Sequence, residues 1–302
     1  MPFCLRDDGL SEVVGFVLIL AVIVIALSLY QVYGVPAAGR EAEIAHMNHV
    51  KDRFVDYKIA LDSLWVNDRK GVLLSTAFDL GTGAGATGGS AFMLPLLTPV
   101  GSGGTISVEE GGANLTITAQ KGETTDTLIQ DLPLGSLSYH SSNRYWVDQT
   151  WTYQGGAIFL SQGKMTAVRV GPSIVVAKSV DDITLNVALI SLDGSGTIAG
   201  SGPVRIETRM RQDVSSSTKG PYERVILIVE GDDRTVGAWK KVFDEVRERA
   251  VVEGVERSWL SVDPGENTVT FTIRPDSDKK VYLTMRQANY TVTIYNAASL
   301  ME

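Results

Sequence analysis

The longest apolar run in the chain lies near its N-terminus. Residues 13–33 carry no charge over 21 positions, and fourteen of them are Val, Ile, Leu or Phe. As a helix, this run would extend about 32 Å at about 1.5 Å per residue, enough to cross a hydrocarbon core of about 30 Å. No other stretch of the sequence approaches this apolar length. We therefore expect one membrane-spanning helix.

A second helical pattern follows the apolar run. Seven apolar residues recur at a spacing near 3.5, the period of an amphipathic helix, and the pattern ends before Asn67. They are Ile44, Met47, Val50, Phe54, Tyr57, Leu61 and Leu64. Between the two patterns, Gly34 and Pro36 predict a kink or a brief break. The stripe fits a helix that packs on its own head domain, and it fits the stalk helix of a filament subunit equally well.

The rest of the chain changes to a β pattern. Beyond Gly71 the apolar residues follow a period of two, in short runs separated by turn sequences rich in Gly, Asp and Pro. One helical segment, residues 235–253, interrupts them, with Asp232 or Asp233 as its predicted N-cap and Gly254 at its end. The predicted class is α+β: a long N-terminal hydrophobic and amphipathic helix, then a β-rich, sandwich-like head with one inserted amphipathic helix.

Charge and cysteine content exclude several classes of function. The 302-residue chain holds 27 Lys and Arg against 35 Asp and Glu, a net charge of −8, without a dense basic run. Nucleic-acid binding requires cations that neutralise phosphates, so we expect no nucleic-acid partner. The single cysteine, Cys4, excludes an intrachain disulfide and a multi-cysteine metal centre.

Three interpretations of the N-terminus compete. A secretory signal peptide would be cut near residues 35–37, but the apolar run is longer than the roughly 7–15 residues of an ordinary h-region. A plain signal anchor would leave the run uncut. In the third interpretation the cut precedes the run. The string from Arg6 to Phe16, RDDGLSEVVGF, resembles the class III signal of archaeal type IV pilin-like proteins.

This resemblance implies a route of processing and assembly. A prepilin peptidase would cut between Gly9 and Leu10, leaving residues 1–9 as a leader, residues 10–66 as a stalk helix and residues 67–302 as an extracellular head. The helix would first lie in membrane lipid, with its N-terminus cytoplasmic, and would then pack against other pilin subunits in a filament. The residues expected to form this membrane and filament helix are Val13, Phe16, Leu18, Ile19, Leu20, Val22, Ile23, Ile25, Leu27 and Leu29.

Motifs that suggest catalysis lack the partners that their chemistry needs. Gly83, Gly85 and Gly88 match GxGxxG, but no helical pattern follows to receive a phosphate. Ser161 and Lys164 match SxxK without the other two motifs of penicillin-recognising enzymes. We therefore expect no catalytic residue and no cofactor.

A metal site is also not expected. Glu43, His46 and His49 recur every three residues on the second helix, where neighbouring side chains could approach one ion. Only one ExxH motif is present, whereas di-iron bundles use two. The sequence therefore predicts that these three residues form solvated helix surface.

Two further features concern the head. Five aromatic residues lie between Tyr139 and Tyr153, and alternation along strands predicts that they fill a sheet core in preference to a surface that binds sugars or proteins. Asn114 and Asn289 each begin an N-x-T triplet, so both are candidate glycosylation sites of an external domain.

These patterns together predict a non-enzymatic, pilin-like surface subunit. It would be anchored by its N-terminal helix and assembled into a type IV pilus-like filament. The alternative is a monomeric, membrane-anchored extracellular binding protein that never polymerises. A mature chain that starts at Leu10 would separate these interpretations from a secreted, soluble domain.

Overall fold

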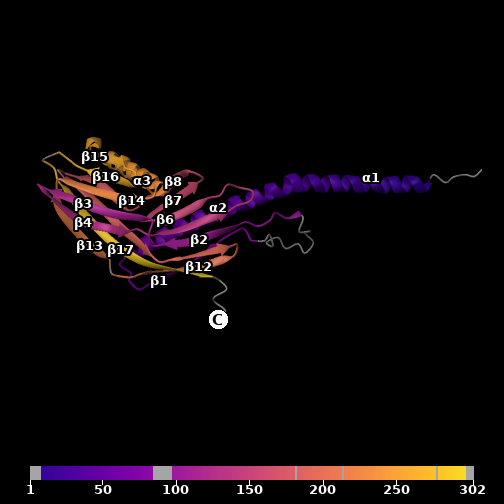
Figure 1. The fold of residues 1–302 in the computed structure, drawn as a ribbon, viewed down its shortest axis with the longest axis horizontal. Coiled ribbons are helices and arrows are strands. Elements are labelled where there is room, and N and C mark those ends of the chain that lie inside the picture. Colours follow the sequence, from indigo (N-terminus) through magenta and orange to yellow (C-terminus); the bar gives the residue numbers. More distant parts are fainter. Residues whose placement is uncertain (1–7, 84–96, 181, 213, 277, 297–302) are drawn as a thin grey trace, which may run out of the picture.

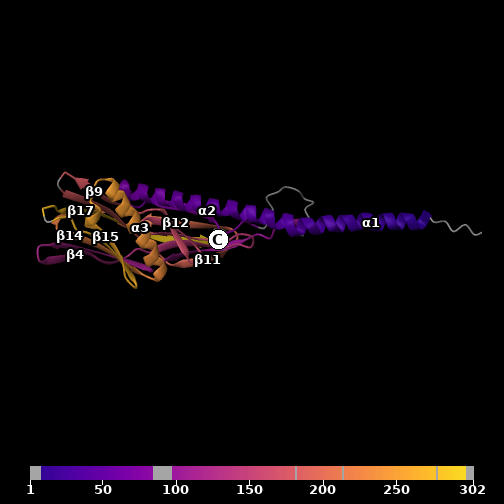
Figure 2. The same ribbon diagram turned by 90° about the horizontal axis from the view of Figure 1, so that it is seen from above.

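A computed structural model describes residues 8–83, 97–180, 182–212, 214–276 and 278–296. The chain begins with a long helix made of α1 (Asp8–Leu29), a π-helical turn η1 (Tyr30–Gly34) and α2 (Val35–Val66). Figures 1 and 2 show α1 projecting beyond the strands, whereas α2 runs along them. A long N-terminal helix followed by a β-rich head confirms the predicted fold class.

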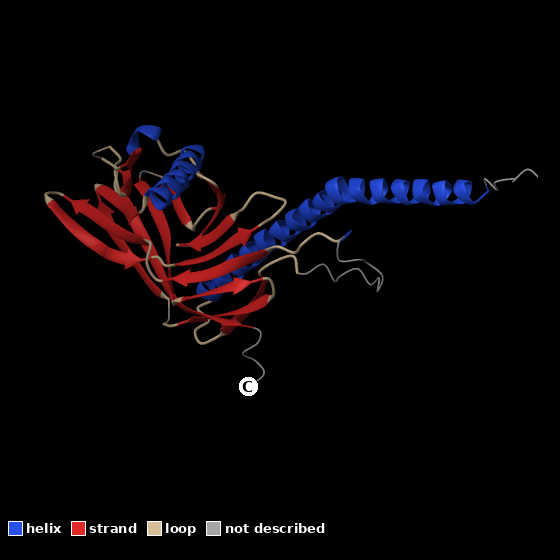
Figure 3. Ribbon diagram, turned by 45° about the vertical axis from the view of Figure 1, so that its right-hand side comes forward, coloured by secondary structure: helices blue, strands red, loops and turns tan. Residues whose placement is uncertain are grey.

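The helix bends where the sequence predicts a kink, as Figure 3 shows. Pro36 has no N–H, and its ring would collide with the carbonyl of the residue four positions earlier in a regular helix. The π turn relieves this conflict, because the N–H of Val35 donates to the carbonyl of Tyr30, five residues back. The chain therefore changes direction without leaving its helical hydrogen bonding.

The head contains three sheets in the described part of the chain. Sheet A has the order β1 (Leu73–Asp79), β12 (Pro203–Met210), β17 (Val281–Asn296), β10 (Asp182–Asp193) and β9 (Ile174–Ser179), and β13 (Ser215–Tyr222) also pairs with β17. Sheet B has the order β11 (Gly196–Gly200), β2 (Gly103–Glu109), β5 (Ser136–Ser142), β6 (Thr150–Gln154), β7 (Ala157–Gln162) and β8 (Met165–Val170). Sheet C has the order β15 (Leu260–Pro264), β16 (Thr268–Ile273), β14 (Arg224–Gly231), β3 (Ala113–Lys121) and β4 (Thr124–Pro133).

Sheet A separates two hydrophobic cores. Its central strands β10 and β17 are parallel, whereas the other described pairings are antiparallel. In β10, Leu185 and Val187 belong to the core beneath α3 (Asp233–Val252), and Ile190 and Leu192 belong to the core beneath α2. Successive side chains of a strand point to opposite faces, so the two cores lie on opposite sides of this sheet. Burial on both faces suits a parallel pair.

The amphipathic stripe of α2 packs on the head. Phe54 and Leu61 are fully buried, and the Phe54 ring contacts Phe78 and Trp151 at centroid distances of 5.4 and 6.5 Å. The Tyr57 hydroxyl lies 2.9 Å from the Thr208 hydroxyl of β12. Ile44, at the start of the stripe, is half-buried. The predicted period thus identifies the face of α2 that contacts the head.

The inserted helix α3 (Asp233–Val252) covers the second core. Asp232 caps it, because its carboxylate accepts a hydrogen bond of 2.8 Å from the N–H of Thr235. Gly254, with φ at +88°, allows the chain to turn after the helix. Trp239 and Phe243 form its buried face, and the Phe243 ring stacks on Phe271 at 5.4 Å. The predicted cap and end are confirmed, and the helix begins two residues before the predicted start.

Several strands of the head do not show the alternation of apolar residues that predicts a strand. The polar strands β4 and β13 cannot be identified from a period of two in the apolar residues. Sequences such as SSSTKGPY in β13 carry almost no apolar alternation. They become strands because long-range partners accept their backbone hydrogen bonds, as β17 does for β13.

Candidate functional site: the exposed helix and its junction with the head

Apolar side chains cover α1 on every side. The consecutive residues Val17, Leu18, Ile19 and Leu20 are 51–63% exposed, and four successive residues complete a helical turn. All the residues expected on the membrane and filament helix are exposed in this way: Val13, Phe16, Leu18, Ile19, Leu20, Val22, Ile23, Ile25, Leu27 and Leu29. A helix that is hydrophobic all round needs an apolar environment around its whole circumference.

The helix Val13–Val66 is the one element in the described residues that is long and apolar enough to cross a membrane. The exposed, apolar N-terminal half of this helix is consistent with a membrane anchor or a signal sequence. The predicted cleavage point, Gly9 and Leu10, lies in the first turn of α1 and stays a prediction. The division of the chain into a leader, a stalk helix and a head, after residues 9 and 66, also stays a prediction. The helix α2 does end at Val66.

A carboxylate holds the start of α2 to the head. Glu43 is 1% exposed, and its two oxygens accept hydrogen bonds from the backbone N–H groups of Arg144 (2.7 Å) and Tyr145 (2.8 Å). The two partners lie in the loop between β5 and β6, about a hundred positions away in the sequence. Hydrogen bonds to an ionised group are stronger than neutral ones, so this contact fixes the loop against the helix.

Two neighbouring contacts complete this junction. Gly39 leaves room for the ring of Tyr145, since a Cβ at position 39 would lie only 2.3 Å from a ring carbon. The guanidinium of Arg40 lies 4.4 Å from the ring centroid of Trp146, a cation–π contact. We call Gly39, Arg40, Glu43, Tyr145 and Trp146 the helix–head clasp. It attaches the start of α2 to the β5–β6 loop.

A histidine extends the clasp into the core. The Tyr139 hydroxyl donates to the carbonyl of Leu80 at 2.8 Å and lies 3.1 Å from Nε2 of His46. A phenol has one proton, so Nε2 of His46 must be the donor in the second bond. Burial lowers the pKa of His46 below its ordinary value of 6.5, and the nearby carboxylates of Asp79 and Glu43 oppose this shift.

The expectation of a solvated surface at Glu43, His46 and His49 is therefore wrong for two of the three. Glu43 and His46 are buried, and only His49 is exposed. Periodicity could not reveal this, because the covering loop comes from residues far along the chain. No cluster of three or more metal-ligating side chains occurs within the part of the chain that the structure describes.

The aromatic segment divides into two groups. Tyr139, Trp151 and Tyr153 are at most 2% exposed and belong to the core beneath α2, as expected. Tyr145 and Trp146 lie instead in the β5–β6 loop and contact α2. The signal that could have identified them is the run of non-alternating polar residues around Asn143, which predicts a loop.

The remaining candidates occupy separate places. Asn114 is exposed on β3, whereas Asn289 is half-buried on β17 and its side-chain oxygen accepts from Gln287 at 3.3 Å. Ser161 and Lys164 lie at the β7–β8 turn, and the Ser161 hydroxyl pairs with Thr166 at 2.9 Å. Gly85 and Gly88 lie outside the described residues.

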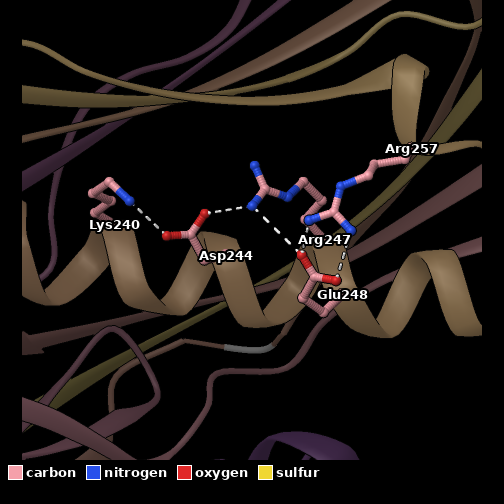
Figure 4. Close-up of polar contacts among 5 residues, drawn as sticks. All are labelled: Lys240, Asp244, Arg247, Glu248 and Arg257. Atoms are coloured by element: carbon pink, nitrogen blue, oxygen red, sulfur yellow. Dashed lines mark hydrogen bonds and ion pairs between the residues drawn. The ribbon is translucent and has the colours of Figure 1, made fainter.

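Charged side chains on α3 form a surface network (Figure 4). Asp244 pairs with Lys240 at 2.7 Å and with Arg247 at 3.0 Å, and Glu248 binds Arg257 through both oxygens. The last pair connects α3 to the short helix η3 (Arg257–Trp259). These groups are partly exposed, so the network contributes little stability per pair.

Fold and junction together define a class: a β-rich head of three sheets attached to a long helix whose first half is apolar on all sides. The chain belongs to the family of unknown function DUF7289, which residues 102–289 match. This match extends from just before β2 into β17 and covers more than half of the chain. Searches of curated proteins and of solved structures found no match.

Proposed function

We propose that this protein is a non-enzymatic, pilin-like surface subunit. Its N-terminal helix anchors it in the membrane with the head outside the cell, and the helix then packs against copies in a type IV pilus-like filament. A prepilin peptidase acts on the leader before assembly. The observation that carries the proposal is the bare surface of α1, which is apolar on all sides and extends away from a folded head.

The energetic argument rests on the exposed area of α1. Apolar surface gains roughly 25 cal/mol for each Å² removed from water, so a helix with this surface has a large driving force to leave water. Lipid satisfies that requirement for a single subunit. Neighbouring helices satisfy it equally in a filament, where each helix is surrounded by others.

A charge in the middle of α1 tests the proposal. Ile23 is 49% exposed, and an Asp at the centre of a membrane helix costs about 2.5–3.5 kcal/mol. In the native host we expect Ile23→Asp to abolish surface filaments seen by immunogold electron microscopy, and Ile23→Leu to leave them unchanged. Membrane fractionation of the same cells shows whether the Asp variant still inserts.

The outcomes of these experiments distinguish a filament subunit from an anchored protein that does not polymerise. Inserted Ile23→Asp protein without filaments supports assembly through α1. Unchanged filaments in that variant would overturn it. Wild-type protein that extracts as a monomer from cells without filaments favours the second candidate, an anchored binding protein, for which lipid alone covers α1. A mature N-terminus at Leu10 by mass spectrometry supports the processing step.

A further inference from the structure

Strand alternation gives sheet B two chemically opposite faces. On β5 and β6, Leu137, Tyr139, Trp151 and Tyr153 are buried against the core beneath α2. The residues between them point to the other face, where side chains alternate away from that core. There the sheet carries short hydroxyl side chains: Ser136, Ser138, Thr150, Thr152, Ser161 and Thr166.

These hydroxyls line a groove. It has a volume of about 380 Å³ and lies between the hydroxyl face of β5–β8 and the start of α3. Phe159 contributes an apolar patch to its wall, and Thr235 and Ala238 contribute from α3. The volume falls within the range of about 300–1,000 Å³ that small-molecule sites occupy.

The hydroxyls are positioned within the groove. Ser138 and Thr152 pair across the strands at 3.0 Å, and Ser161 and Thr166 pair at 2.9 Å. A hydroxyl has one donor and two acceptor sites, so each pair keeps capacity for a ligand. Because the side chains are short and sit on sheet strands, they present this capacity with little loss of conformational freedom.

Two polar side chains in the lining, Ser136 and Gln154, are more than nine-tenths buried. Ser136, on β5, is 7% exposed. Gln154, 6% exposed, lies opposite Ser136, and its side-chain oxygen accepts from the indole N–H of Trp239 at 3.0 Å. Both residues add polar groups to the wall of the groove between sheet B and α3.

The charges around the groove do not favour an anion. Glu109 and Asp232 contribute two carboxylates to the lining against the one guanidinium of Arg234. The N-terminus of α3 is also occupied, because the N–H of Thr235 already donates to Asp232. Groups that both donate and accept, beside one apolar wall, match a neutral molecule rich in hydroxyls.

We propose that the groove between sheet B and the start of α3 binds a neutral, hydroxyl-rich ligand, such as a short glycan chain. This site belongs to the head alone and does not depend on whether the protein polymerises. The head would then bind a glycan through the hydroxyl side chains of sheet B. These lie on the face opposite the buried aromatic residues of β5 and β6.

The binding experiment uses the full-length protein in a zwitterionic detergent that lacks a sugar headgroup. The probes are three neutral trisaccharides (maltotriose, cellotriose and mannotriose) and inorganic phosphate, tested by saturation-transfer NMR and calorimetry. We expect at least one trisaccharide to bind, and we expect Ser138→Ala/Thr152→Val to weaken it at least about tenfold through the lost hydroxyl pair. Thr272→Val, on β16 of sheet C, is the matched control and leaves binding unchanged.

The unfolding temperature of each variant is measured alongside. If the double variant does not fold, Ser161→Ala removes a hydroxyl at the other end of the groove and is expected to weaken binding on its own. Binding of phosphate but of no trisaccharide would overturn the proposal, as would trisaccharide binding that neither groove variant changes. Absence of binding by every trisaccharide would overturn it as well.

Discussion

Individual polar residues of α2 hold the long helix to the head. Glu43 binds two backbone N–H groups of the β5–β6 loop, and His46 donates to Tyr139. Their burial could not be predicted from the sequence, because the pattern of α2 alone places both residues beside its polar face. Their partners lie about a hundred residues away, and only the folded chain brings them together.

His46 should make stability depend on pH. Its pKa is lowered in the folded state, chiefly by burial, so the unfolded chain binds a proton more readily below its ordinary pKa of 6.5. The free energy of unfolding is therefore highest above that pH and falls as the pH drops, by at most about 1.4 kcal/mol per pH unit for one proton. Thermal unfolding from about pH 8 to about pH 5 measures the slope.

Two variants assign this slope to a residue. His46→Gln should flatten the pH dependence, because it removes the group that titrates. His49→Gln, three residues along the same helix and exposed, should keep most of the slope, because burial lowers the pKa of His46 more than the charge of His49 does. A slope that persists in His46→Gln would contradict the assignment.

At the scale of elements, a close contact joins α2 to the β5–β6 loop. Gly39 is the position at which the loop approaches most closely, since the Tyr145 ring occupies the space that a side chain would need. The sequence predicts α2 and α3 well, because a helix repeats its apolar residues locally. It predicts β13 and β4 poorly, because a polar strand is defined by the neighbour that pairs with it.

Gly39→Ala tests the close approach. Its methyl group would overlap the Tyr145 ring, and forced overpacking typically costs about 1–3 kcal/mol, so we expect a lower unfolding temperature. Gly237→Ala on α3 is the control, because no atom lies within 4 Å of a Cβ there. That change should stabilise the protein by about 0.5–1 kcal/mol through helix propensity. If both substitutions change the unfolding temperature equally, the close approach of Gly39 to Tyr145 does not contribute to stability.

At the scale of the whole molecule, the apolar helix α1 is distinct from the folded head. Residues 13–33 belong to neither core of the head, and most of the side chains exposed there are apolar. Two hydrophobic cores on opposite sides of sheet A stabilise the head. Residues of α2 belong to one core, and residues of α3 belong to the other. We therefore expect the head to fold without α1.

Removal of residues 1–33 tests this separation. The shortened chain should be soluble and monomeric without detergent, as judged by size-exclusion chromatography. Its unfolding temperature should stay within about 4 °C of the full chain, the shift that about 1 kcal/mol produces at this size. Aggregation, or loss of cooperative unfolding, would show that α1 supports the head.

Local patterns in the sequence by themselves determined the apolar helix, the bend at Pro36, the buried stripe of α2, the cap of α3 and the β-rich class. Each of these depends on residues close together in the chain, whose period or chemistry is visible directly. Only the tertiary structure decided the rest: the sheet order, the two-sided burial of β10, the clasp at Glu43 and the hydroxyl-lined groove. These features arise where segments distant in sequence meet, and the free energy of those contacts appears only after folding.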